Sequence, residues 1–570
     1  MRKLSQSLMD HDMAMLRAIA SMWGLELVSN VRAEVVGQLS AEMLQPESVE
    51  RILRELSPQE KGALEELVAA GGRIKAHLFT LRHGPIRPFG PGRLEREKPW
   101  REPVSASEGL WYRGLIYRAF DEEEGRLNEF VFVPSDLLPL LPPAERRPRF
   151  TVEAAPPPLR IDAGDLSLVE DVFNLLSYLQ NQEVKPLRDG SLPPHHRERL
   201  SERLTTPQPE RLDFLFHLCQ RIGLVVSPPA AIKGERAPQV REGLLKPNPL
   251  PAKRWLKAPR WQQLQALQKA WRDDPSWNEL WRVEGLECED TGWRNDPLTA
   301  RRKVLGYLSQ CPPGEWLSLS SFIQAIKEVE PDFQRPDGDY RSWYIRRVDT
   351  GEYLLGFQHW DEVEGALIAH LISRPLHWLG VTSLGYAKEG LSSFLITAWG
   401  AAFLGLPHEE PREETPPPLT VKSDLTILFP STGRLYDRFQ LERFATLVES
   451  RPEVKIYRLE RSSLARGLRQ GIEIGMILAF LRKASGGRLP RNVALTLRDW
   501  ARKYGRIRLR SEVLLETEDG FTLEELRTLP QTGRYLLEVI SERRALVARK
   551  DLPKLLAELK RLGYHVEGRW

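Results

Sequence analysis

A short pattern recurs four times along this 570-residue chain: a helical segment ends, a glycine follows, and a strand-like run begins. Glycine suits such a junction because it adopts the left-handed backbone conformation that turns a helix into a strand. The recurrence predicts tandem small modules in a helix-rich α+β fold. Coincidence is the alternative, because helix–glycine–strand junctions are common. The four junctions are LWYRGLIYRAF, LCQRIGLVVS, LHWLGVTSLG and WARKYGRIRL, with their glycines at Gly114, Gly223, Gly380 and Gly505.

The last junction lies in Arg461–Glu516, where the sequence predicts three short helices followed by a β-hairpin. Ser462 or Ser463 is expected to cap the first helix, and Pro490 fits the first turn of the third. Three helices and a hairpin describe a winged helix-turn-helix, in which the last helix enters a DNA groove and the wing touches phosphates. The apolar stripe predicted for the third helix consists of Val493, Leu497, Trp500 and Tyr504.

Basic residues concentrate on this third helix and its wing. Between Arg482 and Arg510 the chain has ten Lys/Arg against one acid, Asp499, a net charge of about +9. We expect the helix cations to approach the groove and the wing cations to contact phosphates, although a solvated arginine-rich face is the alternative. The predicted DNA-binding residues are Arg491, Arg498, Arg502 and Lys503 on the helix and Arg506, Arg508 and Arg510 on the wing.

Residues 419–570 resemble the N-terminal domain of XPB-type DNA helicases, also known as a helicase-associated domain. The resemblance rests on segments in the family's order: LTVKSDLTILF, DRFQLERFATLVES, VKIYRLE, LPRNVALTLRDWARKYGRIRL and ALVARKDLPKLLAELKRLGYHV. Upstream, segments such as GPIRPFGPGRLEREKPW and FQHWDEVEGALIAHLISRPLHWLG resemble longer prokaryotic proteins that carry this domain without a helicase motor. The resemblance implies a separate helicase or nuclease partner, and it supplies no catalytic positions.

Proline-rich stretches divide the rest of the chain, because proline disrupts regular elements and favours extended linkers. Between them, amphipathic helices and strand-like runs predict further modules resembling winged helices. The expected parts are N-terminal helices (1–50), a first module (51–145), a linker (146–168), a second module (169–250), a Trp-rich helical region (251–310), a third module (311–406), a linker (407–418) and the XPB-like domain (419–570).

Two further segments are open to two interpretations. The stretch 83–99 is predicted to be a loop. In one interpretation it wraps a phosphate through Arg82, Arg87 and Arg93; in the favoured interpretation it packs on its own domain. Residues 255–293 contain six of the sixteen tryptophans, which either stack on unpaired bases or, as favoured, pack helices together.

Composition excludes several other classes of protein. Three cysteines cannot form a disulfide framework and match no zinc motif, so a cytoplasmic location is expected. No apolar run approaches the length of a membrane span, and the N-terminus lacks the apolar core of a signal peptide. Overall net charge is only +4, so a nucleic-acid surface requires local clustering.

Familiar catalytic motifs are missing from the sequence. No GxxxxGK[ST] segment occurs, so the phosphate-cradling loop of a helicase motor is absent. The acidic run 361–364 is interpreted as the start of a helix, and the histidines 195, 196, 370 and 377 lack convincing metal spacing. We therefore expect a non-catalytic protein without cofactor or metal that binds duplex or forked DNA; the alternative is a protein–protein adaptor.

Overall fold

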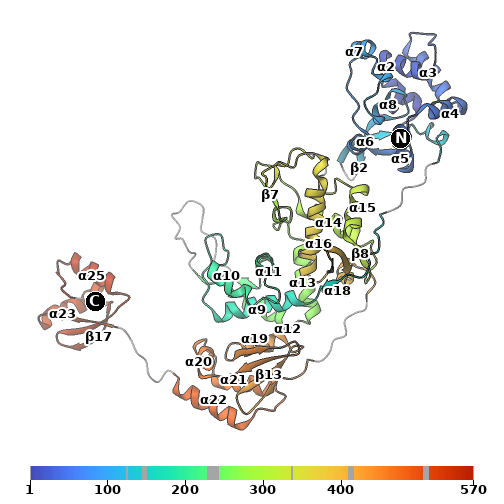
Figure 1. Ribbon diagram of the computed structural model, residues 1–570. Coiled ribbons are helices and arrows are strands. Elements are labelled where there is room, and N and C mark those ends of the chain that lie inside the picture. Colours follow the sequence, from blue (N-terminus) through green and yellow to red (C-terminus); the bar gives the residue numbers. More distant parts are fainter. Residues whose placement is uncertain are drawn as a thin grey trace. The chain divides into compact units, whose positions relative to one another are not determined.

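The computed structural model describes residues 2–123, 126–143, 150–226, 243–335, 338–408, 416–504 and 512–568. The chain divides into two compact units, Met1–Glu414 and Thr415–Trp570 (Figure 1). The structure is 48% helical and contains several small sheets. The predicted helix-rich α+β fold is therefore confirmed.

The N-terminal part of the first unit has one hydrophobic core, with buried residues from Leu4 to Leu141. Ser57 and Glu60 form the reciprocal capping box at the start of α5. Three antiparallel strands pair in the order β1-β3-β2. The elements are α1 (Leu4–Met9), α2 (Met13–Met22), α3 (Arg32–Met43), α4 (Pro46–Glu55), α5 (Pro58–Ala69), β1 (Arg73–Lys75), α6 (Ala76–His83), α7 (Pro91–Glu97), α8 (Ala106–Tyr112), β2 (Tyr117–Glu123) and β3 (Arg126–Phe132).

The stretch 83–99 is only partly the predicted loop, because it contains helix α7. Gly90 precedes this helix and Pro91 occupies its first position, where a missing N–H costs nothing. The three arginines near this stretch are all held in ion pairs: Arg82 with Glu66, Arg87 with Glu108 and Arg93 with Glu97. Packing on its own domain, the favoured interpretation, is what the structure shows.

The central part of the first unit repeats the element order of the N-terminal part. Apart from α7 in the first copy and β9 and α17 in the second, helix–strand–helix–helix–hairpin occurs as α5-β1-α6-α8-β2-β3 and again as α14-β8-α15-α16-β10-β11, and β8-β11-β10 pair as β1-β3-β2 do. The remaining strands pair as β5-β6 and β7-β9. The elements are β4 (Arg160–Asp162), α9 (Ser167–Asn181), α10 (Pro194–Ser201), α11 (Pro209–Arg221), β5 (Val225–Val226), β6 (Lys246–Pro247), α12 (Pro249–Lys257), α13 (Arg260–Arg272), β7 (Leu286–Cys288), α14 (Pro297–Leu308), β8 (Trp316–Ser318), α15 (Leu319–Val329), β9 (Ile345–Arg347), α16 (Ala366–Ser373), α17 (Pro375–Trp378), β10 (Thr382–Ala387), β11 (Gly390–Ile396) and α18 (Ala398–Leu404).

Part of the segment predicted as a linker belongs to this central sheet. Strand β4 pairs with β10, and Ala154 forms a bridge with Leu317 of β8. The Ala155 N–H donates to the Trp316 carbonyl at 2.7 Å. Prolines remove backbone donors but leave the other N–H groups free to pair at a sheet edge.

The predicted glycine junctions have the expected backbone conformation wherever the structure describes them. Gly114, Gly223 and Gly380 have φ of +61°, +71° and +68°. The fourth, Gly505, lies outside the described residues. A Cβ at Gly380 would lie 2.7 Å from the Asp165 carbonyl oxygen, whereas a Cβ at Gly223 would have no neighbour within 4 Å.

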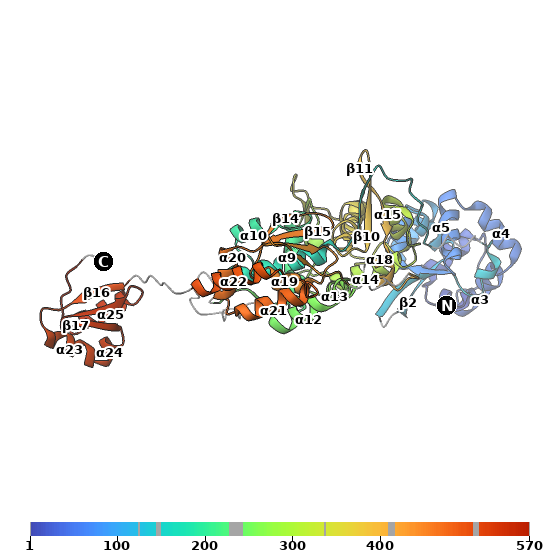
Figure 2. The same ribbon diagram turned by 90° about the horizontal axis from the view of Figure 1, so that it is seen from below.

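The second unit contains two hydrophobic cores. Figure 2 labels elements that belong to each, β14 and β15 for the first and β16 and β17 for the second. Strands in the order β12-β13-β15-β14 pack with helices around the first core, and strands in the order β16-β18-β17 pack with helices around the second. The elements are β12 (Thr420–Val421), β13 (Thr426–Pro430), α19 (Leu435–Leu441), β14 (Thr446–Ser450), β15 (Val454–Arg458), α20 (Arg461–Arg469), α21 (Ile474–Ala484), α22 (Arg491–Lys503), β16 (Glu512–Glu516), α23 (Gly520–Thr528), α24 (Pro530–Gly533), β17 (Leu536–Ser541), β18 (Arg544–Ala548) and α25 (Leu552–Arg561).

His11 is a titratable group inside the N-terminal core. Its ring centroid lies 5.1 Å from that of Trp111 and 5.5 Å from that of Tyr117. Burial lowers the pKa of His11 to about 4, and this outweighs the opposing influence of Asp12 and Asp10. The folded protein therefore keeps this imidazole neutral where an unfolded chain would protonate it.

Alanine substitutions at two of the junction glycines should separate backbone strain from steric contact. Gly223→Ala should cost about 1 kcal/mol, because only the left-handed backbone penalises it. Gly380→Ala should cost more, because the new methyl group also meets the Asp165 carbonyl. Urea unfolding of the full chain, followed by tryptophan fluorescence, would compare the two. Equal losses would show that the close approach to Asp165 is unimportant.

The His11 environment predicts a pH dependence of local stability. Below pH 6.5 the unfolded state binds a proton that the folded state excludes, so stability should fall between pH 6.5 and 4 and then level off. The loss should be up to about 3 kcal/mol relative to His11→Phe, which keeps a ring but cannot titrate. Hydrogen exchange of α2 amides across this pH range would measure it. Parallel profiles for the two proteins would contradict the prediction.

Candidate nucleic-acid interface

The three helices predicted after Arg461 are present as α20, α21 and α22. Glu460, rather than Ser462 or Ser463, is the N-cap residue of α20, and the Ser463 hydroxyl accepts a bond from the Glu460 N–H. The three helices and the sheet share one core, and the Asn492 side chain of α22 donates to the Ser423 carbonyl at 2.8 Å. Helix α22 is thereby fixed against its own sheet.

The two faces of α22 differ as the sequence pattern predicts. Val493 and Leu497 are fully buried. The predicted apolar stripe loosens toward the C-terminal end, where Trp500 is half-buried and Tyr504 is 40% exposed. Arg491, Arg498 and Arg502 are exposed, and their spacing of seven and four residues places them on one side of the helix.

Most of the cations on α21, α22 and their connection have no carboxylate partner within the described ranges. Lys503 is the exception, since its Nζ lies 3.0 Å from Asp499. In the first unit, by contrast, many arginines are paired with acids, including the fully buried Arg301 with Glu279. The exposed cations without such a partner are Arg482, Lys483, Arg488, Arg491, Arg498 and Arg502.

The cations predicted for the wing cannot be placed from the described part of the chain. Arg506, Arg508 and Arg510 lie in 505–511, outside the described residues. Strand β16 pairs with β18, and Glu516 lies opposite Arg544, which is 28 residues later in the chain. Helix α23 and strand β17 lie between the two strands in sequence. The hairpin predicted directly after α22 therefore stays a prediction, and the described partner of β16 is a strand far along the chain.

A groove between α20 and α22 was not anticipated from the sequence. It encloses about 230 Å³, and the Arg461 guanidinium lies 5.8 Å from the Trp500 ring centroid. The apolar pair at positions 464 and 468, one turn apart on α20, was the signal available in the sequence. The groove is lined by Arg461, Leu464, Ala465, Leu468, Trp500, Lys503 and Tyr504.

Each of the three acids in the run 361–364 forms an ion pair within the fold. Asp361 pairs with Lys327 at 2.6 Å, Glu362 with Arg347 at 2.6 Å, and the buried Glu364 with Arg335 at 2.5 Å. Burial raises the pKa of Glu364, and Arg335 opposes that shift. The run starts a helix as predicted, although its first turn, Asp361–Gly365, is a π-helix.

Two of the histidines considered as metal ligands have other partners. His196 Nδ1 lies 2.7 Å from the Tyr178 hydroxyl, and His377 Nδ1 lies 3.0 Å from the Thr382 carbonyl. Within the part of the chain that the structure describes, no group of three or more His, Cys, Asp or Glu residues is arranged to hold a metal ion. Nor does any helix in that part have the length and apolar character needed to cross a membrane.

Comparison with known proteins adds one match. Residues 419–541 match the family described as the helicase conserved C-terminal domain. This region includes α22 and ends with β17, so the candidate interface lies in a helicase-related part of the chain. No curated protein matches the chain.

Proposed function

We propose that this chain is a non-catalytic, helicase-accessory protein that binds duplex or forked DNA through α22. The observation that carries the proposal is the row of exposed arginines on α22, which have no carboxylate partner among the described residues. Cations left without an internal partner are free to replace the counterions of a phosphate backbone. We further propose that residues 419–570 are related to the N-terminal domain of XPB-type helicases and act without a motor, beside a separate helicase or nuclease.

The repeated helix–strand–helix–helix–hairpin order supports a winged-helix interpretation of the first and third modules. Their third helices are poor candidates for a DNA groove, however. All of α8 except the half-buried Trp111 is buried, and α16 is half buried and half of intermediate exposure, with no exposed residue. A helix needs an open polar face to enter a groove. Among these helices, α22 best meets that requirement.

Binding through α22 would be largely independent of DNA sequence. Arginines spaced along one helix face meet phosphates on the groove rim, and phosphate contacts position a protein without identifying bases. Trp500 and Tyr504, at the edge of the groove between α20 and α22, add aromatic surface beside Lys503. The proposed role is therefore attachment to DNA for a partner enzyme, in repair or transcription.

Charge reversal on α22 tests this function. In Arg498→Glu/Arg502→Glu, affinity for a labelled duplex should fall about tenfold or more, and the slope of log affinity against log salt should shrink by about 2. Both side chains are exposed, so folding should be unaffected. Fluorescence anisotropy of duplex and forked DNA at several salt concentrations would measure both effects.

A matched control is Arg96→Glu/Arg101→Glu, which makes the same charge change at exposed residues of the N-terminal part. The control should bind DNA as the wild type does. Equal loss in both variants would indicate a general effect of net charge and contradict the role of α22. Absence of wild-type binding at low salt would refute the proposed function.

One observation favours the second candidate function, a protein–protein adaptor. The hairpin β2–β3 exposes Phe120 by 66% and Leu127 by 73%, next to the exposed acids Asp121 and Glu122. Acidic side chains repel phosphates, whereas exposed apolar groups on a hairpin are typical of protein-binding surfaces.

The adaptor candidate predicts a phenotype confined to this hairpin. Phe120→Ser/Leu127→Ser should abolish co-purification of a protein that binds the wild type, while leaving DNA affinity unchanged. Quantitative mass spectrometry of the two purifications would compare them, with Arg498→Glu/Arg502→Glu as the reciprocal control. An identical set of retained proteins would contradict the adaptor function.

A further inference from the structure

Three tryptophans of the central part form a continuous stack. The ring centroids of Trp281 and Trp293 are 5.6 Å apart with planes at 29°, and those of Trp293 and Trp343 are 5.1 Å apart at 14°. The Arg335 guanidinium lies 4.2 Å from the Trp343 ring centroid and closes the inner end. Trp343 is 8% exposed and Trp281 is 37% exposed, so the outer end of the stack is open to solvent.

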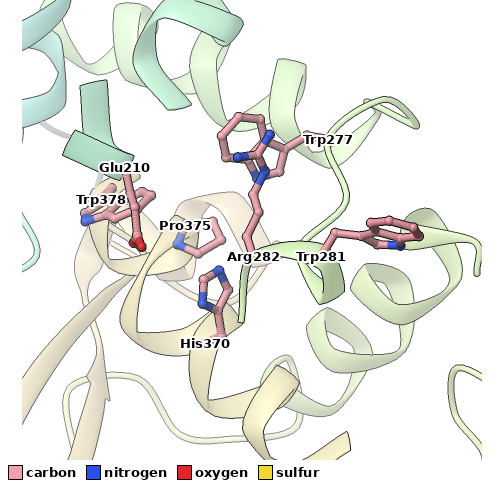
Figure 3. Close-up of a pocket in the computed structure, with 7 residues that line it drawn as sticks. All are labelled: Glu210, Trp277, Trp281, Arg282, His370, Pro375 and Trp378. Atoms are coloured by element: carbon pink, nitrogen blue, oxygen red, sulfur yellow. The ribbon is translucent and has the colours of Figure 1, made fainter. Parts of the chain in front are cut away.

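This outer end borders a small pocket (Figure 3). The pocket encloses about 190 Å³, less than the roughly 300 Å³ at which sites for drug-sized ligands begin, so it suits a single ring system. The guanidinium of Arg282 lies over the Trp277 ring, 3.7 Å from its centroid. The lining residues are Glu210, Trp277, Trp281, Arg282, His370, Pro375 and Trp378.

The wall that carries Trp277 is anchored from inside. Buried Arg301 donates to the carbonyl oxygens of Trp271 and Asp274, each at 2.6 Å, and to that of Trp277. The same guanidinium pairs with Glu279. A loop held at several carbonyls gives the pocket wall one fixed shape, which lowers the entropic cost of binding a ligand.

The pocket lining carries one charge of each sign, Arg282 and Glu210. Arg282 is exposed and has no carboxylate partner among the described residues, whereas Glu210 is paired with Arg374 at 3.8 Å, and Arg374 also lies 3.7 Å from Glu284. The unpaired charge at the pocket is therefore that of Arg282, which suits a phosphate. Burial lowers the pKa of His370 to about 4, so this imidazole adds a neutral hydrogen-bonding group. A methylated-ammonium ligand, which aromatic cages also bind, would meet the Arg282 guanidinium here.

We infer that this pocket takes one unpaired nucleobase of single-stranded or forked DNA, stacked on the open face of Trp281, with Arg282 beside the adjoining phosphate. Bases stack on aromatic side chains regardless of sequence, and arginine adds a cation–π contribution. A base inside a duplex is not available to such a pocket. The inference rests on the proposed nucleic-acid function for its ligand class and deepens it by specifying unpaired DNA.

Trp281 differs in exposure from three buried tryptophans of the Trp-rich region. Trp255, Trp271 and Trp277 are at most 7% exposed and pack helices and loops together, as favoured from the sequence. Stacking on a base is therefore assigned to one exposed ring at the end of a rigid stack.

A fluorescent base analogue tests the inference on the full chain. Forked DNA with 2-aminopurine in its unpaired arm should lose fluorescence on binding the wild type, because stacking on indole quenches the analogue. Trp281→Ala should abolish the quenching and weaken binding of forked DNA about fivefold or more, with duplex affinity unchanged. Trp281→Phe should restore part of both, and Phe521→Ala, at another exposed ring, should change neither.

The outcomes distinguish the two proposals. Duplex binding that needs Arg498 and Arg502, with quenching that survives Trp281→Ala, would overturn the pocket and leave the α22 function standing. Quenching that needs Trp281, without duplex binding, would support the pocket and refute the α22 function. Loss of quenching in Phe521→Ala as well would overturn the pocket. Circular dichroism of Trp281→Ala would verify that the variant is folded.

Discussion

The central part of the chain is organised around the buried ion pair of Arg301 and Glu279. Two charges removed from water are costly unless their remaining hydrogen bonds are satisfied, and here they are. Arg301 binds both carboxylate oxygens and three backbone carbonyls, while the Trp271 indole N–H donates to Glu279 at 2.7 Å. The pair thereby holds together α13, the loop after it and α14. That loop carries Trp277, so one buried guanidinium determines the geometry of the aromatic pocket.

Arginine has two different roles in this protein. In the first unit its guanidinium often closes the structure, as in the pairs Arg211–Asp171 and Arg335–Glu364, where both partners are almost fully buried. On α22 arginines stay exposed without a carboxylate partner in the described ranges. The near-neutral net charge does not reveal this division. Paired charges cancel in the total, whereas the exposed arginines of α22 form a local positive face. Local pairing therefore indicates more about ligands than composition does.

Sequence periodicity predicted the local features well. The helix-rich α+β fold, the three helices after Arg461, the buried Val493 and Leu497, and the left-handed Gly114, Gly223 and Gly380 follow from patterns within a few residues. Long-range pairing was not predictable in this way. The partner of β16 and the helix inside 83–99 were missed, and the pocket combines α11, the loop after α13 and the region around α17. The role proposed for Trp281 rests on its exposure, which depends on tertiary packing.

The stretch between the first module and α9 has a consequence for aggregation. Ala154 and Ala155 bond to β8, one outer strand of the central sheet, and β4 bonds to β10 on the other side. Prolines 156–158 separate these two contacts. The longer strands of this sheet are thus covered at both margins by very short, proline-flanked pieces, which are poor templates for a strand from another molecule. The proline-rich connector therefore also disfavours pairing of this sheet's edges with a strand of another molecule.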